Sequence, residues 1–189
     1  MSLARLVFGL GLAALPGIAV AEDPAGCGGF KWPLERERAA LLKQQKPSLA
    51  NGGALAYDVP TALKLAPLSD ANLPQPPERA AKFEPSYAGH FTLPQPAKPG
   101  VYKITLSSYA WIDVLDNGKF LHPRAFSGAT ACEGARKSVK FDLPARALGV
   151  QISGVEDREI SLIRVAGGIA APQRSQCRGR RRRTPIAKC

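Results

Sequence analysis

Three residues at alternating positions of one short segment have side chains that suit carbohydrate binding. Tyr109, Trp111 and Asp113 lie within residues 107–118, and in a β-strand they would share one face. An aromatic ring beside an acid is a common arrangement for stacking on a sugar ring while accepting a hydrogen bond from a hydroxyl. The spacing therefore predicts a ligand-binding surface at these three residues.

The same segment also fits a purely structural interpretation. The intervening residues Ala110, Ile112 and Val114 are aliphatic and would face the core. A helix over residues 33–43 needs a partner surface, and covering Trp111 would stabilise the fold because its side chain is large. We favour this structural interpretation and keep the ligand platform as the alternative, with Lys103 or Arg136 as its basic neighbour.

Carboxylates in the same half of the chain allow a second kind of chemistry. A pair of acids can hydrolyse a glycosidic bond when the two carboxyl groups lie a few ångströms apart. The candidates are Asp113, Asp116, Glu133 and Asp142. Exposed acids on strands are normally only solvated, so we expect a non-enzyme and keep a small carboxylate-dependent hydrolase as the alternative. In that alternative, Asp113→Asn abolishes activity.

Metal and cofactor chemistry is not expected. The two histidines, His90 and His122, are far apart in the sequence and have no histidine or cysteine at ligand spacing. The small-residue segment 126–134 fits either a binding loop or a tight crossover between strands.

The positive charge is concentrated at the C-terminus. The formal net charge is +11, but residues 172–189 contain seven basic residues and no acid. The arginines Arg178, Arg180, Arg181, Arg182 and Arg183 could bind a polyanion through phosphate contacts. No aromatic residue is interleaved for base stacking, so nucleic acid is not the expected partner, and we favour a disordered basic tail.

The N-terminus predicts export. Arg5 precedes an apolar run over residues 6–15, and Ala19-Val20-Ala21 follows as a cleavage site. We expect a signal peptide over residues 1–21, a periplasmic or extracellular location, and no transmembrane segment after cleavage. In an oxidising compartment the four cysteines can pair in three ways or stay free. We predict a disulfide between Cys27 and Cys132, the two within the body, and leave Cys177 and Cys189 open.

The elements that would carry these residues are mostly strands. Residues 33–44 predict a helix with Leu34, Leu41 and Leu42 on one side, preceded by Trp32 as a packing anchor. Ten of the seventeen prolines fall between residues 47 and 99, which excludes long helices there.

Period-two alternation between turn residues predicts a sheet with one face in the core. The expected strands are 61–65, 87–93, 101–106, 136–143, 147–152 and 158–165. Asn117-Gly118 predicts a tight hairpin because both positions tolerate positive φ. The fold class expected is mainly β: an antiparallel, jelly-roll-like β-sandwich with one N-terminal α-helix.

The order of these strands resembles bacterial pre-peptidase C-terminal domains, which are small secreted β-sandwiches. The resemblance covers residues 87–165 and rests on the succession of 100–106, 110–114, 138–143 and 149–154 before a closing strand. It implies an accessory or binding role without catalysis. The chain departs from that pattern in having no attached enzyme domain and in its own helix and proline-rich part.

The predicted organisation is a signal peptide over 1–21, an N-terminal segment over 22–57, a sandwich over 58–171 and a tail over 172–189. The sandwich is proline-rich over 58–99 and most regular over 100–166. The expected function is that of an exported, non-catalytic binding or accessory protein of the cell envelope. Its expected partner is a carbohydrate or another envelope protein, and polyanion binding by the tail is a further alternative.

Overall fold

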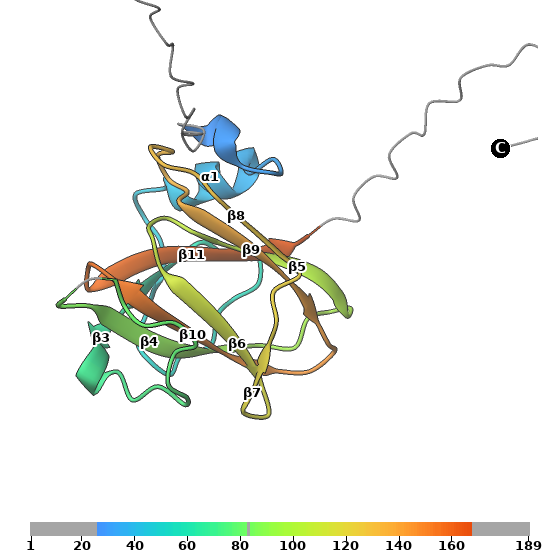
Figure 1. Ribbon diagram of the computed structural model, residues 1–189. Helices are drawn as coiled ribbons and strands as arrows, with labels where there is room; N and C mark the ends of the chain where they lie inside the picture. Colours follow the sequence, from blue (N-terminus) through green and yellow to red (C-terminus); the bar gives the residue numbers. More distant parts are fainter. Residues whose placement is uncertain (1–25, 83, 168–189) are drawn as a thin grey trace, which may run out of the picture.

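The computed structural model describes residues 26–82 and 84–167, which form two β-sheets and a short helix (Figure 1). The six-stranded sheet has, in spatial order, β1 (Ser48–Leu49), β2 (Thr61–Lys64), β11 (Glu159–Ala166), β5 (Gly100–Leu106), β9 (Lys137–Leu143) and β8 (Ala125–Gly128). The five-stranded sheet has β3 (Ala66–Pro67), β4 (Tyr87–Leu93), β10 (Leu148–Val155), β6 (Trp111–Asp116) and β7 (Lys119–Leu121). The predicted mainly β fold with an N-terminal helix is confirmed.

The core lies between the two sheets, where the inward faces predicted from alternation meet. Ile104 and Leu106 of β5, Phe141 of β9 and Val150 and Ile152 of β10 all belong to one buried cluster. Each comes from a strand whose apolar residues recur at every second position, so one face is buried against the opposite sheet. The named strands pair antiparallel except for β1, which runs parallel to β2, and an isolated bridge between Ala54 and Thr92 is also parallel.

The predicted hairpin after β6 is confirmed. Asn117 and Gly118 have φ values of 51° and 75° and connect β6 to β7. Strand β11 is buried on both faces, because its aliphatic residues lie on both. Leu162 packs in the core between the sheets, while Ile163 and Val165 pack with Leu41 on the other side.

Helix α1 (Glu35–Leu41) is shorter than the predicted 33–44. It ends at Leu41, and the Lys46 ammonium donates to the carbonyl oxygens of Leu41 and Lys43, at 2.9 and 2.6 Å. These bonds satisfy groups that a longer helix would have bonded itself. Leu34 and Leu41 are buried as expected, but Leu42 is 42% exposed, so its predicted place on the buried side is wrong.

The helix packs on the outer face of the six-stranded sheet, against β11 (Figure 1). The Trp32 indole before it donates to Ser138 Oγ of β9 at 3.1 Å and packs against a small cluster that contains Leu34 and Cys132. Trp32 is therefore a packing anchor, as predicted.

The predicted disulfide between Cys27 and Cys132 is present and joins the 3-10 turn η1 (Cys27–Gly29) to the segment after β8. The predicted loop 126–134 is only partly a loop, because residues 126–128 belong to the edge strand β8. Within the described ranges, no helix has the length and apolar content needed to cross a membrane. The predicted signal peptide and basic tail lie outside the described residues.

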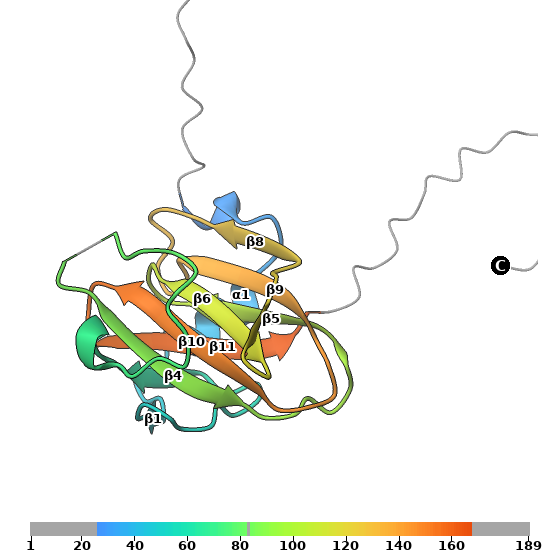
Figure 2. The same cartoon turned by 60° about the horizontal axis from the view of Figure 1, so that its bottom comes forward.

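A proline-rich segment crosses the outer face of the five-stranded sheet. After η2 (Leu68–Asp70) the chain runs in front of β10 and β6 before it enters β4 (Figure 2). We call residues 75–82 of this segment the strap. Gly154 lies at an irregularity of β10 with φ 64°, and a side chain there would come within 3.6 Å of Ala81 of the strap.

Candidate functional site

Trp111 and Asp113 lie where strand alternation placed them, whereas Tyr109 lies outside the strand. Ile112 and Val114 pair with Ile152 and Val150 of β10 and face the core. Trp111 and Asp113 therefore point to the outer face of the five-stranded sheet, and Tyr109 lies in the connection just before β6. Trp111 and Tyr109 are half-buried, whereas Asp113 is only 2% exposed.

Asp113 is buried because three donors converge on its carboxylate. Its Oδ1 accepts from the Trp111 indole at 2.5 Å. Its Oδ2 accepts from the Gln151 amide at 3.1 Å and from the backbone N–H of Glu78 at 3.3 Å. The carboxylate thus fixes the orientation of the indole and ties the strap to the sheet.

The strap, and not the helix, covers this face. Besides the bond from Glu78, the Gln151 amide donates to the carbonyl oxygen of Gln75 at 3.1 Å. The expectation that helix 33–43 covers Trp111 is wrong, because α1 buries Leu41 against the opposite sheet. The proline-rich composition of the strap gave no sign that it packs over a strand.

Three basic side chains surround the two aromatic rings. The Arg79 guanidinium lies 4.8 Å from the Trp111 ring centroid, and the Lys82 ammonium lies 4.8 Å from that of Tyr109. The Lys137 ammonium lies 4.6 Å from the Trp111 centroid and 5.8 Å from the Tyr109 centroid. Such distances allow cation–π attraction. We call these five residues the cation–aromatic cluster.

Lys137 reaches the cluster from the opposite sheet. It is the first residue of β9 and pairs with Leu106, the last residue of β5, so it lies beside the connection that carries Tyr109. Its ammonium donates to the carbonyl oxygen of Ala110 at 2.8 Å. The pKa of Lys137 is lowered from 10.5 to about 8, mainly by burial. The positive charges of Arg79 and Lys82 also lower this pKa, whereas the negative charge of Asp113 raises it.

The basic neighbours expected from the sequence lie elsewhere. Lys103 forms an ion pair with Glu37 of α1 on the outer face of the six-stranded sheet. Arg136 donates to the carbonyl oxygen of Ala129 at 2.5 Å. The basic neighbours of the aromatic rings are instead Arg79, Lys82 and Lys137. Their spacing in the sequence does not predict that they lie near Trp111.

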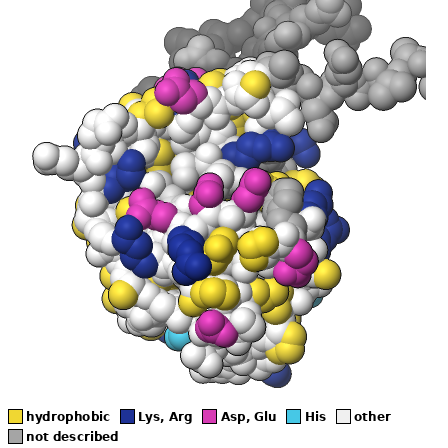
Figure 3. Space-filling model, turned by 90° about the vertical axis from the view of Figure 1, so that its left-hand side faces the viewer, with side chains coloured by type: hydrophobic (Ala, Val, Ile, Leu, Met, Phe, Trp, Pro, Cys, Tyr) yellow, Lys and Arg dark blue, Asp and Glu magenta, His cyan; other side chains and the backbone are white. Residues whose placement is uncertain are grey.

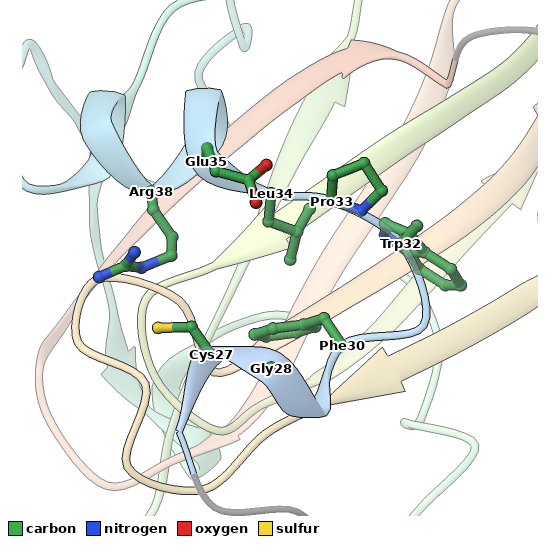
Figure 4. A pocket seen from close by; sticks show the side chains of 8 residues that line it. All are labelled: Cys27, Gly28, Phe30, Trp32, Pro33, Leu34, Glu35 and Arg38. Atoms are coloured by element: carbon green, nitrogen blue, oxygen red, sulfur yellow. The ribbon is translucent and has the colours of Figure 1, made fainter.

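A small hollow lies beside the disulfide (Figure 4). It has a volume of about 170 Å³ between η1 and the start of α1. Phe30 and Leu34 point toward one another across it, and Glu35 and Arg38 lie at its rim (Figure 4). The residues that line it thus belong to the N-terminal segment that packs around Cys27.

Two of the four candidate carboxylates share an open hollow of about 540 Å³ at one end of the sandwich, namely Asp116 and Asp142. Each is paired with an arginine: Asp116 with Arg146 and Asp142 with Arg124, the latter at 3.0 Å. The hydrogen bond from Arg146 lowers the pKa of Asp116. A carboxyl with a lowered pKa is poorly suited to act as a general acid near neutral pH.

Metal-binding groups do not gather in the part of the chain that is described. No group of three or more His, Cys, Asp or Glu side chains is placed to hold an ion there. His90 is half-buried in β4, and His122 is exposed after β7. Figure 3, which views the side of β3, shows basic and acidic side chains interspersed around a group of hydrophobic ones, so this face carries no field of a single sign.

Comparisons with known proteins add no assignment: the chain matches no protein-family model, and no similar curated protein or solved structure was found. The resemblance to pre-peptidase C-terminal domains stays a prediction.

Proposed function

We propose that this chain is an exported, non-catalytic binding protein of the cell envelope that recognises a carbohydrate through the cation–aromatic cluster. The observation that carries the proposal is the convergence on two half-buried aromatic rings, Tyr109 and Trp111, of side chains from the strap and from the opposite sheet. Aromatic rings with a few oriented polar groups are a common composition for saccharide sites.

The fixed orientation of Trp111 supports binding. A ring held by its own hydrogen bond to Asp113 loses little freedom when a ligand arrives, and such preorganisation favours affinity. The burial of Asp113 under three donors leaves it no reach toward a substrate, which favours binding over hydrolysis at this site.

Export is supported by two separate features. The disulfide between Cys27 and Cys132 is compatible with an oxidising, extracytoplasmic compartment. Residues 1–21 have the charge and hydropathy pattern of a signal peptide. We propose a periplasmic or secreted location on these grounds.

Intrinsic tryptophan fluorescence of the mature chain tests the proposal. We expect a saturable change in emission on titration with envelope or plant oligosaccharides. The change should disappear in Trp111→Phe and persist in Trp32→Phe, because Trp32 packs on the other sheet. A change that persists without Trp111, or the lack of any response, would contradict carbohydrate binding at the cluster.

A further inference from the structure

The cation–aromatic cluster contains more positive charge than its surroundings neutralise. Arg79, Lys82 and Lys137 lie close enough for Arg79 and Lys82 to lower the pKa of Lys137. Among residues 26–82 and 84–167, none of the three forms an ion pair with a carboxylate.

Asp113, the acid bonded to Trp111, does not offset this excess. The Asp113 carboxylate carries one negative charge and is already bonded to Trp111, Gln151 and Glu78. Three like charges near one buried carboxylate repel one another. An anion that enters between them would relieve the repulsion and form charge-assisted hydrogen bonds.

The position of the cations also limits how a sugar can use the rings. Arg79 and Lys137 both lie over Trp111, so a neutral sugar has to displace one of them before it can stack. Lys137 is held by the carbonyl oxygen of Ala110, whereas Arg79 lies on the exposed strap and is the one free to move. A ligand that offers Arg79 an anionic group compensates for the contact that it loses.

We infer that the ligand of this site is an acidic saccharide, whose carboxylate or phosphate group binds among Arg79, Lys82 and Lys137 while its ring contacts Tyr109 and Trp111. This inference rests on the proposed carbohydrate-binding function. It assigns the three cations as the residues that select the ligand, and the aromatic rings as the surface that distinguishes a saccharide from a simple anion.

The test is a calorimetric titration of the mature chain with three matched trisaccharides at fixed ionic strength: a galacturonic acid trimer, the neutral galactose trimer, and a galactose trimer with one phosphate. We expect at least one acidic trisaccharide to bind about tenfold more tightly than the neutral one, as one charge-assisted hydrogen bond provides. The tighter of the two acidic probes identifies the group. Lys82→Gln should weaken binding of that probe about tenfold, and should weaken binding of the neutral trimer much less.

Two control variants separate this site from general attraction to a basic protein. Lys119→Gln removes one exposed charge from β7, and Arg181→Gln with Arg182→Gln removes two from the basic tail. Both should bind the acidic probe as the unmodified chain does. Each variant's unfolding temperature confirms that it is folded.

The outcomes distinguish a failure of acidic-saccharide selectivity from a failure of carbohydrate binding itself. If all three trisaccharides bind equally and need Trp111, carbohydrate binding stands and the inference is overturned. If none binds, both fail. The inference is also overturned if inorganic phosphate binds as tightly as the acidic trisaccharides, or if Lys119→Gln or the tail variant weakens binding as much as Lys82→Gln.

Discussion

Asp113 illustrates how a residue chosen for its chemistry can have a structural task. Its carboxylate is nearly inaccessible and accepts from a side chain of its own strand, a side chain of β10 and a backbone group of the strap. A buried acceptor with these partners positions Trp111 and does not itself meet a ligand.

Asp113→Asn should destabilise the fold by about 1 to 3 kcal/mol, because the new amide nitrogen faces a donor in either orientation: the Trp111 indole, or Gln151 and Glu78. Urea unfolding measures the loss. The matched control is Asp142→Asn, whose exposed ion pair with Arg124 should contribute less than about 1 kcal/mol. Equal effects of the two substitutions would mean that Asp113 does not hold the strap.

Lys137 should make stability depend on pH above neutrality. Its pKa of about 8 lies below the 10.5 of an unperturbed lysine, so between these values the unfolded chain binds more protons than the folded one. The free energy of unfolding therefore rises with pH over this window, relative to Lys137→Gln, and the difference is constant below it. Chemical unfolding of both proteins from pH 7 to 10.5 measures it. A difference that stays flat or falls would show that the ammonium is not desolvated.

At the scale of elements, the apolar contact between helix α1 and the sheet centres on Leu41. Leu41 contacts Ile163 and Val165, and β11 thereby has apolar neighbours on both faces. Most of the stability of so short a helix comes from this packing, because seven residues are too few to be helical alone.

Leu41→Ala should cost about 2 to 5 kcal/mol, since it leaves a cavity between α1 and β11. Leu42→Ala provides the comparison: this side chain is 42% exposed, and its loss should cost less than about 1 kcal/mol. Thermal and urea unfolding would measure both variants. If the two losses were similar, the helix would not depend on Leu41 for its attachment.

Most strands were predictable, because the alternation of apolar and polar residues is a local pattern. Which strands pair with each other was not predictable from that pattern. Alternation identified the inward faces of β5, β9 and β10, and Asn117-Gly118 identified a hairpin. The edge strand β8 has no clear signal in the sequence, because it is rich in small residues and does not alternate. Its one large apolar side chain, Phe126, is 64% exposed. A strand shows an alternating apolar pattern when one of its faces is buried, and β8 lacks that pattern.

At the scale of the whole molecule, the disulfide closes a long covalent loop. Cys27 and Cys132 are 105 residues apart, so the bond restricts the unfolded chain over most of the sandwich.

Cys27→Ser with Cys132→Ser should lower the free energy of unfolding by about 4 to 5 kcal/mol in the chain-entropy account. Urea unfolding under oxidising conditions measures the loss, and the unmodified chain with added reductant should approach the same value. A loss below about 1 kcal/mol would indicate that the N-terminal segment stays attached by its packing around Leu34 alone.

Only half of the candidate site was predictable from the sequence, because the other half depends on contacts between distant parts of the chain. Tyr109, Trp111 and Asp113 are adjacent in one segment, so a pattern of period two brings them together. Arg79 and Lys82 come from the strap and Lys137 from the facing sheet. Their meeting depends on the β5–β9 register and on the path of a proline-rich segment, and neither is encoded by spacing.

The single carboxylate of Asp113 joins the indole of Trp111 to the backbone of the strap, and this makes ring and strap thermodynamically linked. Whatever draws Arg79 toward a bound anion also pulls on the neighbouring Glu78, whose N–H is bonded to Asp113. Hydrogen exchange at that one amide should therefore change when the site fills, although the amide itself touches no ligand. The strap would then report occupancy to any molecule that contacts its outer surface.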